Sequence, residues 1–219
     1  MTMIVIRRRN GMSRKIRKIS LLMGSSLLVL VMGVFLTGFA VIPGAENGWQ
    51  NLPVHLVIDQ NGHPTIDDPD GGVTAVMNAV NSRSTGWNSA VRGVLAAAPG
   101  NTGGGRQGDG IPTLNFSGAR VCSGGCVAVT FPLTNNRSEI IDADIYVNDR
   151  VNFTSKAEKD GCTAEIYIEA TMVHEVGHAL GLAHPPGKFW ATMYAYVAPC
   201  IDYQETLSRD DRRGLQTIY

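Results

Sequence analysis

The chain has 219 residues and 19 basic and 19 acidic side chains, so its formal net charge is zero. This length accommodates one domain with its own hydrophobic core. The balanced charge argues against nucleic acid and acidic membrane surfaces as partners, because both require a basic face.

The first 40 residues differ in composition from the rest of the chain. Residues 1–19 carry seven basic side chains and no acidic one, and an apolar run extends from Leu21 to Ala40. These features, with small residues at Gly38 and Ala40, are typical of a secretory signal peptide cleaved after Ala40. An uncleaved signal anchor is the alternative, because about 20 apolar residues can span a bilayer. We therefore expect residues 41–219 to form a secreted monomer, or an anchored domain outside the membrane.

Cleavage would change the charge of the protein. It would remove all seven N-terminal basic residues and leave 12 basic and 19 acidic side chains among 179 residues, a net charge of −7. The exported part would therefore still lack a basic surface for nucleic acid.

A strand and a helix are expected first in the exported part. Residues 53–59 are apolar and β-branched, which predicts a strand. The acidic segment 67–70 precedes apolar residues at helical spacing from Val73 to Val80, which predicts a helix with Trp87 near its end. Residues 99–110 hold six glycines and predict an exposed loop.

Three further strands are expected between residues 113 and 147. Residues 113–116, 126–131 and 140–147 are rich in apolar and β-branched side chains. Asn135 and Asn136 favour a turn, so the last two strands should form an antiparallel hairpin.

The four cysteines, Cys122, Cys126, Cys162 and Cys200, all lie in the exported part. An even number of cysteines outside the cytosol favours disulfides, and four cysteines allow three pairings. Proximity favours Cys122 with Cys126, which leaves Cys162 for Cys200. A second metal site built from these thiols is the alternative, although their spacing does not form paired C-x-x-C motifs.

Residues 174–184 read HEVGHALGLAH, which has the spacing of a zinc site. On a helix, expected here from Thr163 to Leu180, positions i and i+4 share one face, so His174 and His178 can bind one metal. Gly181 permits the positive φ that ends a helix, and His184 can then return as the third ligand.

The same motif supplies a general base. Glu175 lies about 100° around the helix from His174, so its carboxylate can reach a water at the open fourth position without occupying it. Three protein ligands and one open position describe a catalytic zinc site rather than a structural one.

The zinc motif resembles that of the metzincin peptidases, and downstream residues resemble the matrixins within that group. Residues 191–194, which include Met193, resemble the Met-turn beneath the zinc ion, and residues 207–219 resemble the C-terminal matrixin helix. Ala143-Asp144-Ile145 also matches a matrixin strand motif. The resemblance covers most of residues 49–219.

The resemblance implies an α+β metzincin fold and a zinc-dependent endopeptidase. Residues 41–181 should form an upper subdomain with a twisted mixed sheet and two long helices. Residues 182–219 should form a small lower subdomain with Met193 and the last helix. Asp210 or Asp211 should hydrogen-bond towards the Met-turn as structural support. The expected substrates are proteins or peptides, hydrolysed by zinc-activated water with Glu175 as base.

The sequence leaves open whether the protein also binds calcium. Asp144 matches a calcium ligand of matrixins, and Asp67, Asp68 and Asp70 form an acidic cluster. Acidic residues are also expected before a helix because of its dipole, and the glycine-rich loop that partners this aspartate in matrixins is absent here. The family pattern differs as well at Pro185, where matrixins carry serine or threonine after the third histidine.

The sequence leaves two other functions open and predicts one contact with the substrate. The chain is alternatively a catalytically silent zinc module, which Glu175 argues against, or a membrane-tethered docking factor. Residues 127–131 are expected to form the edge strand that pairs with substrate, because the following Pro132 is tolerated at a sheet edge.

Overall fold

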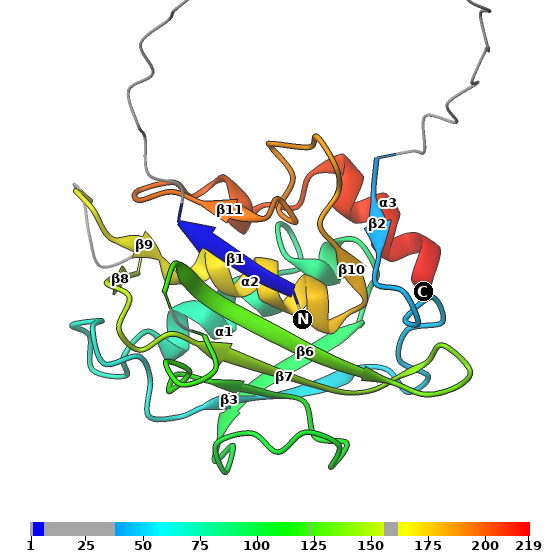
Figure 1. Cartoon of the computed structure of the whole chain (residues 1–219), viewed down its shortest axis with the longest axis horizontal. Helices are drawn as coiled ribbons and strands as arrows, with labels where there is room; N and C mark the ends of the chain where they lie inside the picture. The colour runs from blue at the N-terminus through cyan, green and yellow to red at the C-terminus, as the bar shows by residue number, and fades with distance from the viewer. Residues whose placement is uncertain (1, 7–37, 123, 156–161) are drawn as a thin grey trace, which may run out of the picture.

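The computed structural model describes residues 2–6, 38–122, 124–155 and 162–219 (Figure 1). Most of the expected signal segment, residues 1–40, lies outside these ranges, so its cleavage stays a prediction. Within the described ranges, none of the helices combines the length and apolar character needed to cross a membrane.

A mixed sheet forms the centre of the domain, as expected, and five of its strands come from residues 54–147. These strands are β3 (Val54–Asp59), β4 (Leu95–Gly100), β5 (Thr113–Asn115), β6 (Cys126–Thr134) and β7 (Ile140–Val147). They lie in the order β6-β7-β5-β3-β4, and β6 is the antiparallel member. The predicted hairpin is confirmed, since β6 pairs with β7 across the turn at residues 135–139.

Two more strands extend this sheet beyond β6. Strand β1 (Thr2–Ile6) pairs antiparallel with β6, and β11 (Tyr196–Val197) pairs parallel with β1 (Figure 1). The sequence did not predict either strand. In the resulting seven-stranded sheet β6 lies between β7 and β1, so residues 127–131 belong to an internal strand and not to the free edge that was expected from the sequence.

Two helices pack against one another and against the sheet. Helix α1 (Val73–Asn81) contacts β3 and β4, and helix α2 (Ile168–Ala179) contacts β6 and β7. With nine and twelve residues they are shorter than the two long helices expected. Residues Val73, Val76 and Val80 are the buried positions of α1, so the apolar spacing in the sequence marks the face that packs.

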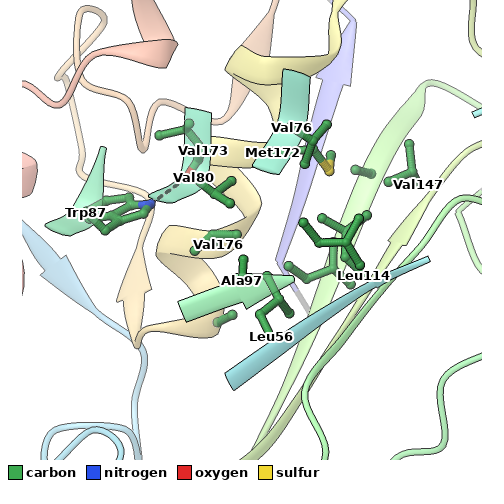
Figure 2. Packing of buried hydrophobic residues seen from close by; sticks show 14 of the residues in the cluster. Leu56, Val76, Val80, Trp87, Ala97, Leu114, Val147, Met172, Val173 and Val176 are labelled. Atoms are coloured by element: carbon green, nitrogen blue, oxygen red, sulfur yellow. Dashed lines mark hydrogen bonds between the residues drawn. The ribbon is translucent and has the colours of Figure 1, made fainter. Parts of the chain in front are cut away.

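The core lies between these helices and the sheet. Figure 2 shows Val76 of α1, Val176 of α2 and Leu114 of β5 converging on it. Trp87 is fully buried, and its indole Nε1 donates to the carbonyl of Val173 at 2.8 Å. Burying each valine, leucine or methionine side chain of this core stabilises the fold by about 1.5–3 kcal/mol. The core thereby fixes α2, the helix that carries the zinc motif.

Helix α2 begins five residues later than predicted, at Ile168 rather than Thr163. The Glu165 carboxylate accepts hydrogen bonds from the backbone N–H groups of Thr163 and Ala164, at 3.0 Å each. Residues Ile166–Tyr167 form strand β9, which pairs with β8 (Phe153–Thr154). These contacts hold residues 163–167 in a turn and a strand, so the helix cannot include them.

The remaining elements are short strands, two 3₁₀ helices and the last α-helix. They are β2 (Ala40–Val41), the 3₁₀ helix η1 (Trp87–Ser89), β10 (Leu182–Ala183), the 3₁₀ helix η2 (Tyr203–Glu205) and α3 (Arg209–Ile218). Strand β2 pairs with β10, directly after the zinc helix. The start of the expected mature chain is thus tied to the segment that leads to the third histidine.

Candidate metal centre

Three imidazole rings converge at one point beside α2. The Nε2 atoms of His174, His178 and His184 lie 3.0–3.2 Å from one another. A tetrahedral zinc ion with bonds of about 2.0–2.1 Å separates its nitrogen ligands by roughly 3.3 Å. The spacing of the three nitrogens therefore fits a single zinc ion.

Backbone carbonyls orient two of the rings. His174 Nδ1 bonds to the carbonyl of Thr192 and His178 Nδ1 to that of Leu182, at 2.6 Å each. A carbonyl oxygen can only accept a hydrogen bond, so Nδ1 must be the donor and carries the hydrogen. The lone pair on Nε2 is left for a metal, in the arrangement that metal-binding histidines usually have.

The environment keeps all three rings neutral. Burial lowers the pKa of His174 to about 3 and that of His184 to about 4, and it lowers the pKa of His178 well below its ordinary value. Neutral imidazole is the form that binds zinc. No proton has to be displaced at pH 7 before a metal ion binds.

The chain reaches His184 through a glycine turn. Helix α2 ends at Ala179, and Gly181 has a φ of +101°, a conformation that strains residues with a Cβ atom. The reversal leads into β10 and brings His184 back against the helix. The sequence predicted this positive φ at Gly181.

The carboxylate of Glu175 lies next to this centre and is fully buried. Its Oε2 accepts a short hydrogen bond from the hydroxyl of Thr130 on β6, while its Oε1 has no partner among the described residues. Burial raises the pKa of Glu175 to about 8, and the bond from Thr130 opposes this rise. One carboxylate oxygen is thus held by Thr130, and the other is buried without a hydrogen-bond partner among the described residues.

Thr130 is a site residue that sequence reasoning missed. It belongs to residues 127–131, which were expected only as a substrate-pairing edge. A threonine inside an apolar run that is expected to be buried needs a hydrogen-bond partner, and this requirement was the available signal. The partner could not be known without the tertiary fold.

The segment around Met193 lies against the zinc helix. A Cβ atom at Gly177 would come within 2.3 Å of Met193 Sδ and 2.5 Å of the Trp87 ring. Glycine at this position therefore allows the methionine to reach the helix between the first two histidines. Met193 is buried.

Asp211 supports this turn. Its carboxylate accepts hydrogen bonds from the backbone N–H groups of Thr192 at 2.8 Å and Met193 at 3.2 Å. It also forms a capping box with Ser208 at the start of α3. Asp210 does not take part, because its carboxylate lies 4.0 Å from Lys188 Nζ on the surface side.

Comparisons with known proteins agree with this geometry. The family model described as Matrixin matches residues 114–219. Matrix metalloproteinase-25 of Homo sapiens is 38% identical over 80 residues, which are 36% of this chain and 14% of that protein. Metalloendoproteinase 4-MMP of Arabidopsis thaliana is 32% identical over 115 residues, which are 52% of this chain and 29% of that protein.

The chain carries a matrixin-like metzincin domain. A putative matrix metalloproteinase of Trichoplusia ni ascovirus 2c is also similar, with 37% identity over 81 residues, 36% of this chain and 14% of the relative. The chain thus spans less than a third of the length of these relatives.

Two disulfides frame the matrixin-like domain. Cys122 is joined to Cys126 and Cys162 to Cys200, which is the pairing that proximity favoured. The first bond lies at the start of β6. The second joins the turn before α2 to the segment after β11. The thiols are therefore not available for the alternative metal site.

Calcium ligands are not evident among the described residues. Asp68 and Asp70 accept backbone hydrogen bonds from residues 70–74 and so shape the start of α1. Asp144 is buried on β7, where it bonds to Thr113. Among the described residues, the groups of three ligand atoms close enough to share a metal are the histidine trio and Cys162–Glu165–Cys200. Calcium stays an untested alternative.

A glycine-rich loop lies near Asp144 in the fold, although the sequence did not indicate one beside it. Residues of this loop contact the neighbours of Asp144. A Cβ atom at Gly105 would meet Thr113 Oγ1 at 3.1 Å, and Gly108 N donates to Asp142. The loop precedes β5 in the chain, and only the folded sheet brings it next to β7.

Proposed function

We propose that this protein is an exported zinc-dependent endopeptidase in which Glu175 is the general base. The convergence of three neutral imidazoles beside a buried carboxylate carries the proposal. Zinc bound by His174, His178 and His184 would polarise a peptide carbonyl and lower the pKa of water. Export rests on the sequence of residues 1–40 and on the two disulfides, which persist outside the cytosol.

Glu175 would transfer the proton. Its unpartnered Oε1 would accept a proton from the attacking water, and the same carboxyl group would then pass it to the departing amine. The positive charge of a bound metal would lower the pKa of Glu175 below the value that burial alone produces. The carboxylate form needed for proton transfer would then be populated at neutral pH.

Cleavage of residues 1–40 would remove β1 and leave the edge of β6 free to hold the substrate. Strand β1 already pairs there, with Thr2 opposite Thr130, and continues between β6 and β11. An extended peptide of a protein substrate could form the same backbone hydrogen bonds, which would place its scissile bond beside Glu175. This supports residues 127–131 as the substrate-pairing strand.

Hydrolysis of a denatured protein or a peptide library by the purified protein would test this proposal. We expect cleavage that is abolished by a chelator and restored by zinc, with His178→Ala inactive and depleted in zinc. Bound zinc without cleavage of any peptide would favour the catalytically silent module instead.

Thr130 should matter for the rate rather than for metal binding. Thr130→Val removes a hydrogen bond to a charged group, which is worth about 1.5–3 kcal/mol, so we expect a loss of kcat of about tenfold or more. Thr130→Ser keeps the hydroxyl and should restore most of kcat. Zinc content should be equal in all three proteins. A valine variant as fast as the wild type would contradict the positioning of Glu175 by Thr130.

A further inference from the structure

The backbone carbonyl of Thr192 accepts hydrogen bonds from two side chains. His174 Nδ1 lies 2.6 Å from this oxygen, and Gln204 Nε2 lies 3.0 Å from it. The same Nε2 also donates to the carbonyl of Tyr194 at 2.9 Å. A carbonyl oxygen has two lone pairs, so both acceptor positions of Thr192 are used. Gln204 and the first of the three histidines therefore share one backbone oxygen.

Gln204 is a fully buried polar side chain. It is the buried residue of the 3₁₀ helix η2, which packs against α2. Its Nε2 must face the two carbonyls, because a carbonyl oxygen cannot donate a hydrogen bond. Its Oε1 is buried without a hydrogen-bond partner among the described residues. A buried acceptor without a partner costs free energy, so packing alone would favour an apolar residue here. The donor group of the amide explains why a glutamine suits this position.

The Thr192 carbonyl needs such a donor because no sheet holds it in place. His178 Nδ1 also bonds to a carbonyl at 2.6 Å, that of Leu182. Leu182 belongs to β10 and pairs with Val41 of β2, so backbone pairing holds this part of the chain. Thr192 lies in a turn, and the Asp211 carboxylate binds its N–H. Side chains thus hold Thr192 at both its N–H and its carbonyl.

We propose that Gln204 is a positioning residue of the metal centre, which holds the Thr192 carbonyl where that carbonyl fixes the ring of His174. This inference rests on the proposed zinc site but not on peptide hydrolysis. Without the amide, the carbonyl would keep only its bond to the ring, and carbonyl and ring could move together. The lone pair of His174 Nε2 would then point less accurately at the place where the three rings converge, and zinc would bind more weakly.

Zinc affinity, measured by competition with a chromophoric chelator, would test this role. Gln204→Met removes the amide and keeps nearly the same size. Loss of a direct hydrogen-bond partner of a metal-binding histidine typically lowers metal affinity by about 10–100-fold. Gln204 acts through Thr192, so we expect the lower end of this range, a loss of about tenfold. The control Tyr203→Phe removes a hydrogen bond from the adjacent residue to another carbonyl, that of Phe189, and should keep the wild-type affinity.

The ring N–H groups distinguish positioning from a general loss of stability. His174 and His178 each donate from Nδ1 to a carbonyl at the same distance, but only the first carbonyl is also bound by Gln204. NMR of the zinc-loaded protein can follow the exchange of both protons with solvent. In Gln204→Met we expect the His174 proton to exchange about tenfold faster and the His178 proton to keep its wild-type rate. General loosening of the fold would accelerate both.

A tenfold loss of affinity with faster exchange at His174 alone supports the inference, even if no peptide is hydrolysed. Unchanged affinity, or equal changes at His174 and His178, overturns it, even if the wild type is a chelator-sensitive peptidase. If Gln204→Met does not fold, Gln204→Asn allows the same comparison, because it keeps an amide that is too short to reach both carbonyls. A folded wild type that binds no zinc would contradict the proposed zinc site and this inference with it.

Discussion

Replacing Glu175 with alanine or glutamine should lower peptide hydrolysis by several orders of magnitude and leave the zinc content unchanged. The carboxylate is not one of the three expected metal ligands, and its Oε1, which has no hydrogen-bond partner among the described residues, is the atom that would accept the proton of water in the proposed mechanism. Loss of a general base alone typically costs about 10²–10⁴ in rate. Turnover with a peptide substrate and metal analysis of the same samples would provide the measurement.

Glu175→Gln tests the role of the base more specifically than Glu175→Ala does. Glutamine keeps the size of the side chain and can still accept the hydrogen bond from Thr130, so a loss of activity reports the missing base rather than a cavity. If the glutamine variant retained more than about a tenth of wild-type turnover, proton transfer by Glu175 would be wrong.

Removal of the Cys162–Cys200 disulfide should lower the free energy of unfolding more than removal of the Cys122–Cys126 disulfide. The bond closes a loop with a sequence separation of 38, which includes α2 and the Met193 segment. The chain-entropy relation gives about 4 kcal/mol for a loop of this length. Denaturant unfolding of the double variant Cys162→Ser, Cys200→Ser should show this loss.

The other disulfide is the matched control. Cys122 and Cys126 are separated by only four positions, for which the same relation gives about 2 kcal/mol. We expect the double variant Cys122→Ser, Cys126→Ser to be the more stable of the two. Equal or reversed losses would show that loop closure in the unfolded chain does not control the effect.

Local patterns in the sequence were sufficient to predict much of the fold. The strand at residues 140–147 has the predicted bounds, and the hairpin follows from the turn between β6 and β7. The histidine spacing predicted three ligands around one point because helix geometry and one glycine fix their relative positions. Each of these features depends on residues that are close in the chain.

Features that depend on distant residues were not predicted. Strand β4 has the sequence LAAAPG, which lacks β-branched residues, and it forms because it pairs with β3 along its whole length. Thr130 lies 45 residues before Glu175, and their hydrogen bond exists only once β6 packs beneath α2. The pairing of β1 with β6 also joins segments that no local pattern connects.

The bonds of Asp211 couple the metal centre to helix α3. This carboxylate caps α3 and holds the turn whose Thr192 carbonyl orients His174. The orientation of a zinc ligand therefore depends on the first turn of a helix that supplies no zinc ligand itself. Zinc affinity should fall when the start of α3 is disrupted, although all three histidines are still present.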